Sequence, residues 1–219
     1  EQLVIAHENI KSGYELRRSN NLRDSIEKFK AAKTLLVKIG NQYTSLICDY
    51  WIATIMFQLN EVEASNLMHL NLAKSAEARN YKWAATQSYI RLVYGANSEN
   101  KHSLALQYNK NAFELATETN DAYNLERILN SFANINYLFG NYEQAYLYSE
   151  KTLAVNSLDQ SISRQLWIDY DTLSNLSFAK NYFYSAIEFQ KEAEKLANTL
   201  SDSTYIQLSN TYLGMFYTA

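Results

Sequence analysis

Residues 137–145 read YLFGNYEQA, and residues 178–186 repeat this pattern as FAKNYFYSA. In each run a residue that tolerates a left-handed backbone, Gly140 or Asn181, interrupts a helical pattern, and a small residue follows five positions later. Such residues commonly end a helix. The same register holds Asn further up the chain, at Asn20, Asn60 and Asn100. The sequence therefore predicts a helix–turn–helix unit that recurs along the whole chain.

Small residues mark the same period. One series has steps of 40, 40, 40, 41 and 40 residues, and consists of Gly13, Ala53, Val93, Ala133, Ser174 and Gly214. A second series consists of Ser25, Ser65, Ala105, Ala145 and Ala186. Small side chains at facing positions let two antiparallel helices approach closely. A fixed period of this length is typical of a stack of repeats, which usually works by presenting a surface.

The composition favours an all-α fold. The 219 residues include no Pro and only five Gly, and 47% are apolar. Apolar residues recur at helical spacing in both halves of every unit. We expect the first helices of the units near residues 2–18, 42–59, 82–98, 122–139, 161–179 and 203–219. We expect the second helices near 22–39, 61–79, 101–119, 142–156 and 182–200.

The uniform repeat predicts one continuous domain over residues 1–219. Its units are about 2–40, 42–80, 82–120, 122–160, 161–201 and a partial unit at 203–219. The chain starts without Met and stops inside a helical pattern, so we expect a fragment of a longer protein, with a cytoplasmic location favoured. Four residues, Tyr212, Met215, Phe216 and Tyr217, should form an apolar edge that further repeats or a second copy of the chain would cover.

Charge and cysteine content exclude several classes of function. The net charge is −3 and there is no long basic stripe, which argues against a nucleic-acid partner. Cys48 is the sole cysteine and lies on an apolar helix face, which indicates a buried, inert thiol. No stretch is long and apolar enough for a membrane span.

No catalytic motif is present, so we expect no enzyme activity, no metal and no cofactor in this chain. The three histidines, His7, His69 and His102, lie in different units and share no helical turn. There is no Gly-rich phosphate loop, nucleophile elbow or calcium loop. Paired carboxylates such as Glu61 and Glu63 lie on polar helix faces, where solvation is the simpler reading.

The two runs quoted above, with LALQYNKNAFELA at residues 104–116, resemble the tetratricopeptide repeat (TPR). The resemblance covers the whole chain but departs in period, because the TPR usually has 34 residues and a Pro near its end. It resembles the longer variants found in peptide-sensing regulators, kinesin light chains and bacterial signalling proteins. The resemblance implies a right-handed α-solenoid of five units plus one extra helix.

In TPR arrays the first helices line the concave face, where ligands bind. Carried over position by position, the resemblance implies a groove lined by Tyr14, Arg17, Tyr50, Thr54, Phe57, Gln87, Tyr94, Asn97, Arg127, Asn130, Asn134, Tyr137, Asp171, Asn175 and Phe178.

Asparagines give this groove a specific chemistry. Asn130 and Asn134 lie one turn apart, and Asn175 occupies the Asn134 position one unit later. Each side-chain amide offers a donor and an acceptor, so a ladder of them suits the backbone of an extended peptide. Arg127, one turn before Asn130, could meet a carboxylate.

The sequence thus predicts a scaffold that binds a protein or an extended peptide. The alternative is the sensory or regulatory arm of a larger bacterial protein, such as a CHAT-type peptidase, a histidine kinase or a peptide-responsive transcription factor. The residues alone do not choose between these two.

Overall fold

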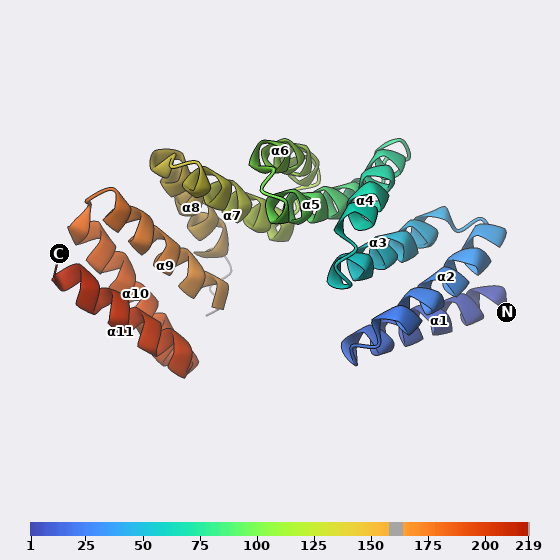
Figure 1. The fold of residues 1–219 in the computed structure, drawn as a ribbon, viewed down its shortest axis with the longest axis horizontal. Helices are drawn as coiled ribbons and strands as arrows, with labels where there is room; N and C mark the ends of the chain where they lie inside the picture. Colours follow the sequence, from blue (N-terminus) through green and yellow to red (C-terminus); the bar gives the residue numbers. More distant parts are fainter. Residues whose placement is uncertain (158–163, 219) are drawn as a thin grey trace. The chain divides into compact units, whose positions relative to one another are not determined.

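A computed structural model describes residues 1–157 and 164–218 of the chain. Within these residues the fold is all-α, as the composition predicts (Figure 1). Its helices are α1 (Gln2–Arg18), α2 (Leu22–Lys38), α3 (Gln42–Gln58), α4 (Val62–Glu77), α5 (Lys82–Ser98), α6 (His102–Glu118), α7 (Ala122–Leu138), α8 (Tyr142–Ser157), α9 (Arg164–Ala179), α10 (Phe183–Leu200) and α11 (Ser203–Tyr217).

The observed bounds confirm the predicted helix–turn–helix units to within a few residues at each end. The predicted start of a first helix at 161 and the predicted end at 219 lie outside the described residues. The chain divides into two compact units, Glu1–Asp121 with α1–α6 and Ala122–Ala219 with α7–α11, called here the N-terminal and C-terminal units. The single continuous domain expected from the repeat stays a prediction.

The helix ends explain the Asn register. At the turn inside each repeat the backbone is left-handed, with φ of 61° at Asn20, 64° at Asn60, 57° at Asn100, 73° at Gly140 and 62° at Asn181. After Asn20, the amide of Asn21 donates to the carbonyl of Leu16 at 2.8 Å, which satisfies an otherwise orphaned carbonyl of the last turn. Asn and Gly are favoured here because other side chains clash in this backbone region.

The small-residue series marks where the two helices of a repeat touch. The Ser25 hydroxyl donates to the Gly13 carbonyl at 2.7 Å, and Ser65 donates to Ala53 in the same way. Further along, Ser174 on the first helix donates to Ala186 on the second at 2.9 Å, so the bond is kept with its direction reversed. A Cβ on Gly13 would lie 2.9 Å from the Phe29 ring, which explains glycine there.

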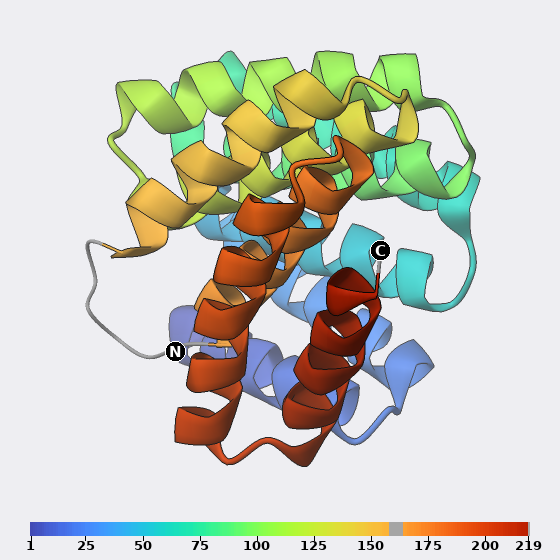
Figure 2. The ribbon, with the colours of Figure 1, turned by 90° about the vertical axis from the view of Figure 1, so that its left-hand side faces the viewer.

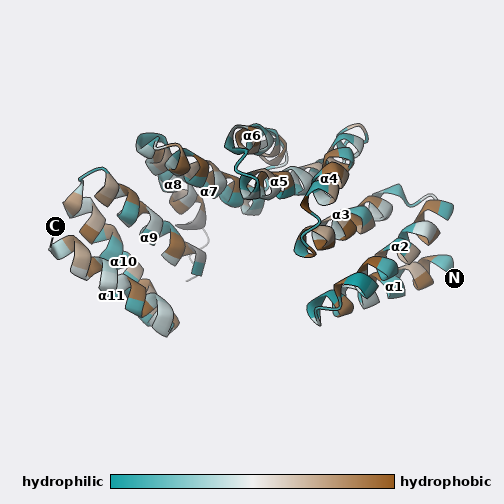
Figure 3. Cartoon of the chain, in the orientation of Figure 1, coloured by the Kyte–Doolittle hydropathy of each residue, from teal (hydrophilic) through white to brown (hydrophobic). Residues whose placement is uncertain are grey.

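Packing within each unit is sequential. In the N-terminal unit each helix contacts the next, and α3 also contacts α5, so the first helices lie in one layer. In the C-terminal unit α10 contacts both α9 and α11, and Figure 2 shows α10 and α11 antiparallel. Hydrophobic and hydrophilic residues are mixed along every helix (Figure 3). In the described part of the chain no helix is long and apolar enough to cross a membrane.

The last helix differs from expectation at one residue. Phe216 is 4% exposed and stacks on Phe178 of α9 with ring centroids 4.7 Å apart. Its assignment to an open apolar edge is therefore wrong, because it points back into its own unit. Met215 and Tyr217 are exposed, as predicted.

Candidate functional site

The first helices of the N-terminal unit are joined by arginines lying over aromatic rings. The Arg17 guanidinium of α1 lies 4.8 Å from the centre of the Trp51 ring of α3 and donates to Gln58 Oε1 at 3.2 Å. One repeat later, Arg91 Nε of α5 donates to the Tyr50 hydroxyl of α3 at 3.0 Å. These contacts fix the first helices side by side and place two positive charges on this layer.

A cavity of about 330 Å³ opens between α3, α4 and α5, which is within the size range of ligand sites. Exposed side chains, Tyr94 and Gln58, line it together with buried ones, so it communicates with solvent. Its full lining is Thr54, Phe57, Gln58, Ser65, His69, Arg91 and Tyr94.

Two buried polar side chains of this cavity, Thr54 and His69, form no hydrogen bond in the described part of the chain. Thr54 is 2% exposed and His69 is 1% exposed. Within residues 1–157 and 164–218, the Thr54 hydroxyl and both ring nitrogens of His69 form no hydrogen bond. Buried polar groups in folded proteins are almost always satisfied, because an unmade bond costs about 1–3 kcal/mol. Two such side chains lining one solvent-connected cavity make it a candidate ligand site.

The cavity is positively charged. Burial, and then the charge of Arg91, lower the pKa of His69 from 6.5 to about 3, so the imidazole is neutral at physiological pH. A neutral imidazole carries one N–H donor and one acceptor. The Arg91 side chain uses Nε for Tyr50, and its two terminal nitrogens have no partner among the described residues.

A polar cluster in the C-terminal unit is centred on a carboxyl group instead of a guanidinium. Asn175 Nδ2 donates to the Asp171 carbonyl at 2.9 Å and to its carboxylate at 3.2 Å. From α10, Gln190 Nε2 donates to Asp171 Oδ1 at 3.3 Å. Burial raises the pKa of the Asp171 carboxyl, against the effect of the Gln190 bond. Here two side-chain amides of the chain donate to an internal carboxylate, while Gln190 Oε1 forms no hydrogen bond within the described residues.

The structure brings together part of the predicted groove. Thr54, Phe57 and Tyr94 line the cavity, with Tyr50 holding Arg91 at its wall. In the C-terminal unit the predicted Asp171 and Asn175 are joined directly. Their role in ligand binding stays a prediction.

Three further predicted groove residues contact neighbouring side chains or are buried. The Tyr14 ring packs edge-on against Phe29 and Trp51, at 5.3 and 5.2 Å between centroids. Phe178 stacks on Phe216, and Gln87 is 7% exposed. Tyr14 and Phe178 are half-buried, and a ligand role for all three stays a prediction.

The remaining predicted residues are dispersed. Asn97 Oδ1 lies 3.2 Å from His102 Nδ1, and Arg127 donates to Asn124 Oδ1 at 3.4 Å. Asn130 is half-buried, while Asn134 and Tyr137 are exposed.

Gln58, Ser65, His69 and Arg91 complete the cavity and were not predicted as site residues. A signal for His69 exists in the repeat register. The core position held by Phe29 in the first unit is held by polar residues in the others: His69, Asn109, Ser149 and Gln190. The register therefore marks His69 as one of four buried polar residues at this position, and the cavity beside it sets it apart from the others.

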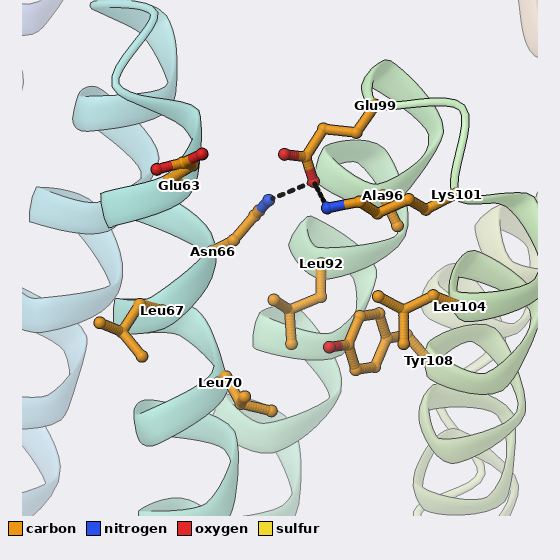
Figure 4. Close-up of a pocket in the computed structure, with 10 residues that line it drawn as sticks. All are labelled: Glu63, Asn66, Leu67, Leu70, Leu92, Ala96, Glu99, Lys101, Leu104 and Tyr108. Carbon is orange, nitrogen blue, oxygen red and sulfur yellow. Dashed lines mark hydrogen bonds and ion pairs between the residues drawn. The ribbon is translucent and has the colours of Figure 1, made fainter.

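A second pocket, of about 310 Å³, lies between α4, α5 and α6 (Figure 4). Asn66 Nδ2 and Lys101 Nζ of this pocket both donate to Glu99 Oε2, at 3.4 and 3.3 Å, while Asn66 Oδ1 forms no hydrogen bond within the described residues. Glu63, Ala96, the leucines and Tyr108 form the rest of its wall. The cavity at His69 is the stronger candidate, since two of its side chains, Thr54 and His69, are buried and form no hydrogen bond in the described ranges.

The structure places no metal cluster in the described ranges: no three His, Cys, Asp or Glu side chains converge there. Cys48 is buried as predicted, and burial raises the pKa of its thiol to about 12, which suppresses the reactive thiolate.

Comparison with protein-family models gives no match, and neither does comparison with curated protein sequences. Solved structures match well. The apo form of RapI superposes with a TM-score of 0.84 at 13% identity, over 97% of this chain and 77% of RapI. A STAND protein with a tetratricopeptide repeat sensor, from Pyrococcus horikoshii, gives 0.84 at 15% identity, over 97% of this chain and 32% of that protein.

A third structure is the Rap conjugation gene regulator of plasmid pLS20 in complex with a Phr peptide. Its TM-score is 0.70 at 14% identity, over 98% of this chain and 59% of that chain. At these identities the likeness concerns the fold. It confirms the TPR-like, all-α solenoid that the repeat predicts.

Proposed function

We propose that this chain is a peptide- or protein-binding scaffold that recognises its ligand with the layer of first helices. One observation carries the proposal: a solvent-connected cavity in which the buried Thr54 hydroxyl and His69 imidazole form no hydrogen bond within the described residues, beside the half-buried Arg91 guanidinium. Buried polar groups are rarely left in this state without water or a ligand. The fold-level neighbour solved with a Phr peptide supports a peptide as the ligand class.

The same proposal gives the chain no catalytic role and no nucleic-acid partner. The net charge of −3 and the solitary arginines suit a peptide better than a polyanion. Self-association through exposed Met215 and Tyr217 of α11 is a separate possibility within this proposal.

A regulatory arm of a larger protein is the second candidate. The observation in its favour is the match to the STAND protein with a TPR sensor, which covers 32% of that chain. The two candidates share the ligand face and differ in what the bound ligand controls.

The test is selection from a library of random linear decapeptides with free C-termini, followed by fluorescence anisotropy on synthetic winners. We expect enrichment, and roughly tenfold weaker binding in Asn134→Ala, since the Asn134 amide is exposed on α7, a first helix of the C-terminal unit. Asn198→Ala on α10 is the matched control and should bind as the wild type does. No enrichment, or winners that ignore every first-helix substitution, would refute the proposal.

A further inference from the structure

We infer that the cavity between α3, α4 and α5 binds a carboxylate group of the ligand, held by Arg91, Thr54 and His69. This inference rests on the proposed peptide-binding function and names the chemical group that this part of the layer recognises.

The open hydrogen-bonding capacity at this site is mainly donor capacity. The Arg91 terminal nitrogens, the Thr54 hydroxyl and one N–H of neutral His69 all donate. A carboxylate offers about four lone-pair positions on two oxygens and pairs with a guanidinium through two parallel bonds. It therefore suits the donors, which outnumber the acceptors among these groups.

Charge selects the same ligand group. Arg91 supplies one positive charge to the cavity lining, and His69 is neutral. A carboxylate balances one charge, whereas a phosphate group carries about −1.5 to −2 at neutral pH. Burying an unbalanced charge is costly, so a singly charged anion fits best.

The repeat itself shows what fills such a site. Shifting Tyr50, Thr54 and His69 by 121 residues gives Asp171, Asn175 and Gln190. In the C-terminal unit the amides of Asn175 and Gln190 both donate to the Asp171 carboxylate, which comes from the chain. In the N-terminal unit the position of Asp171 is held by Tyr50, so no carboxylate is supplied internally.

The lining indicates the ligand's neighbouring groups. Phe57 and Tyr94 form an aromatic wall next to the polar groups, and Tyr94 is 46% exposed. An acidic side chain or a C-terminal carboxylate with an adjoining apolar stem would fill both parts. Both sources have the same chemistry at the polar end, and the probes below separate them.

The test uses small probes, so its outcome does not depend on a selected peptide. The ring C–H signals of His69 are followed by NMR as four compounds are added: N-acetyl-phenylalanine, its C-terminal amide, N-acetyl-glutamate amide and N-acetyl-glutamine amide. We expect saturable shifts from one or both carboxylates and none from the two neutral amides. A shift from N-acetyl-phenylalanine assigns a C-terminal carboxylate, and one from N-acetyl-glutamate amide an acidic side chain.

Two substitutions with matched controls complete the test. Thr54→Val and Arg91→Met should each weaken the binding of the carboxylate probes at least about tenfold, as expected for a lost charge-assisted hydrogen bond. Thr86→Val removes a hydroxyl of equal burial that already bonds to the Lys82 carbonyl, and Arg79→Met removes one exposed charge outside the cavity. Both controls should bind as the wild type does.

The inference is overturned if carboxylates and amides act alike, or if Thr54→Val and Arg91→Met behave as their controls do. Circular dichroism confirms that each variant is folded. If peptides are enriched but no probe shifts the His69 signals, the carboxylate site is rejected and the peptide-binding scaffold is retained. If the carboxylate probes bind but no peptide is enriched, the carboxylate site is retained and the peptide-binding scaffold is rejected.

Discussion

The helix sets α3–α5 and α9–α11 place side chains at the same repeat positions and satisfy them in opposite ways. Around α9, the amides of Asn175 and Gln190 converge on Asp171. Around α3, Thr54 and His69 face a cavity and have no partner in the described part of the chain. The difference teaches that one repeat position can stabilise a unit or be kept open for a ligand, depending on whether an acceptor comes with it.

The largest expected effect is the loss of the internal carboxylate. Asp171→Ala would leave the buried Gln190 amide without its acceptor and remove the bond from Asn175 to the carboxylate, although Asn175 keeps its bond to the backbone carbonyl of residue 171. We expect the free energy of unfolding to fall by about 2–3 kcal/mol. Urea unfolding followed by circular dichroism measures this. The exposed Glu8→Ala is the control and should shift it by less than about 0.5 kcal/mol. Equal effects from the two would show that the Asp171 cluster is not stabilising.

The second-largest expected effect is a loss of stability in acid, caused by His69 in the cavity. The unfolded chain protonates His69 near pH 6.5, but the folded chain only near pH 3, so the unfolded state binds more protons between these values. Stability is therefore complete above about pH 6.5 and falls as the pH drops, by up to about 1.4 kcal/mol per pH unit from this residue.

His69→Gln places at this position the residue that α10 has, and it does not titrate. Between pH 6 and pH 4.5 the wild type should lose roughly 2 kcal/mol more than this variant in urea unfolding. All other titrating groups are common to both proteins. Parallel curves would mean that His69 is solvated or paired in solution.

Two of the three asparagines of the predicted ladder, Asn175 and Asn134, should differ in their effect on stability. Asn175→Ala breaks the bond to Asp171 and should cost about 1 kcal/mol of unfolding free energy. Asn134→Ala affects an exposed amide and should cost less than about 0.5 kcal/mol. If the two variants lose a similar amount of unfolding free energy in urea, the bond between Asn175 and Asp171 does not stabilise the fold.

The smallest effect has an unusual sign. Thr54→Val removes a buried hydroxyl without a partner in the described structure, so stability should stay unchanged or rise by about 0.5 kcal/mol. Thr86→Val, at similar burial, breaks a 3.0 Å bond and should lose about 1 kcal/mol. Thermal and urea unfolding of both variants measure this difference. A loss of stability in Thr54→Val would mean that the Thr54 hydroxyl forms a stabilising hydrogen bond in solution.

The fold was predictable because its signals are local. The left-handed Asn residues and the small-residue series depend on backbone sterics and helix contact within about 12 residues. These constraints act in every repeat, so each signal recurs five times along the sequence. The helix bounds follow directly from them.

The site was only partly predictable, since it joins helices from different repeats. Arg91 meets Tyr50 from 41 residues away, and no local pattern records that contact. Tyr14 and Phe178 share the register of groove residues, yet Trp51 and Phe216 cover them. Which first-helix positions stay open depends on the size of the side chain one repeat later. The polar series at the Phe29 position was visible in the sequence and is the clue to His69.

The spacing of the interhelical bonds has a kinetic consequence. The Ser25 and Ser65 bonds close loops of 12 residues, and the bonds between first helices of adjacent repeats, such as Arg91 to Tyr50, close loops of 41. Proteins rich in such short-range contacts fold fast, because little chain entropy is lost before each contact forms. The chain also contains no proline, so no prolyl isomerisation step slows it. Each helix pair can thus form soon after its second helix is synthesised.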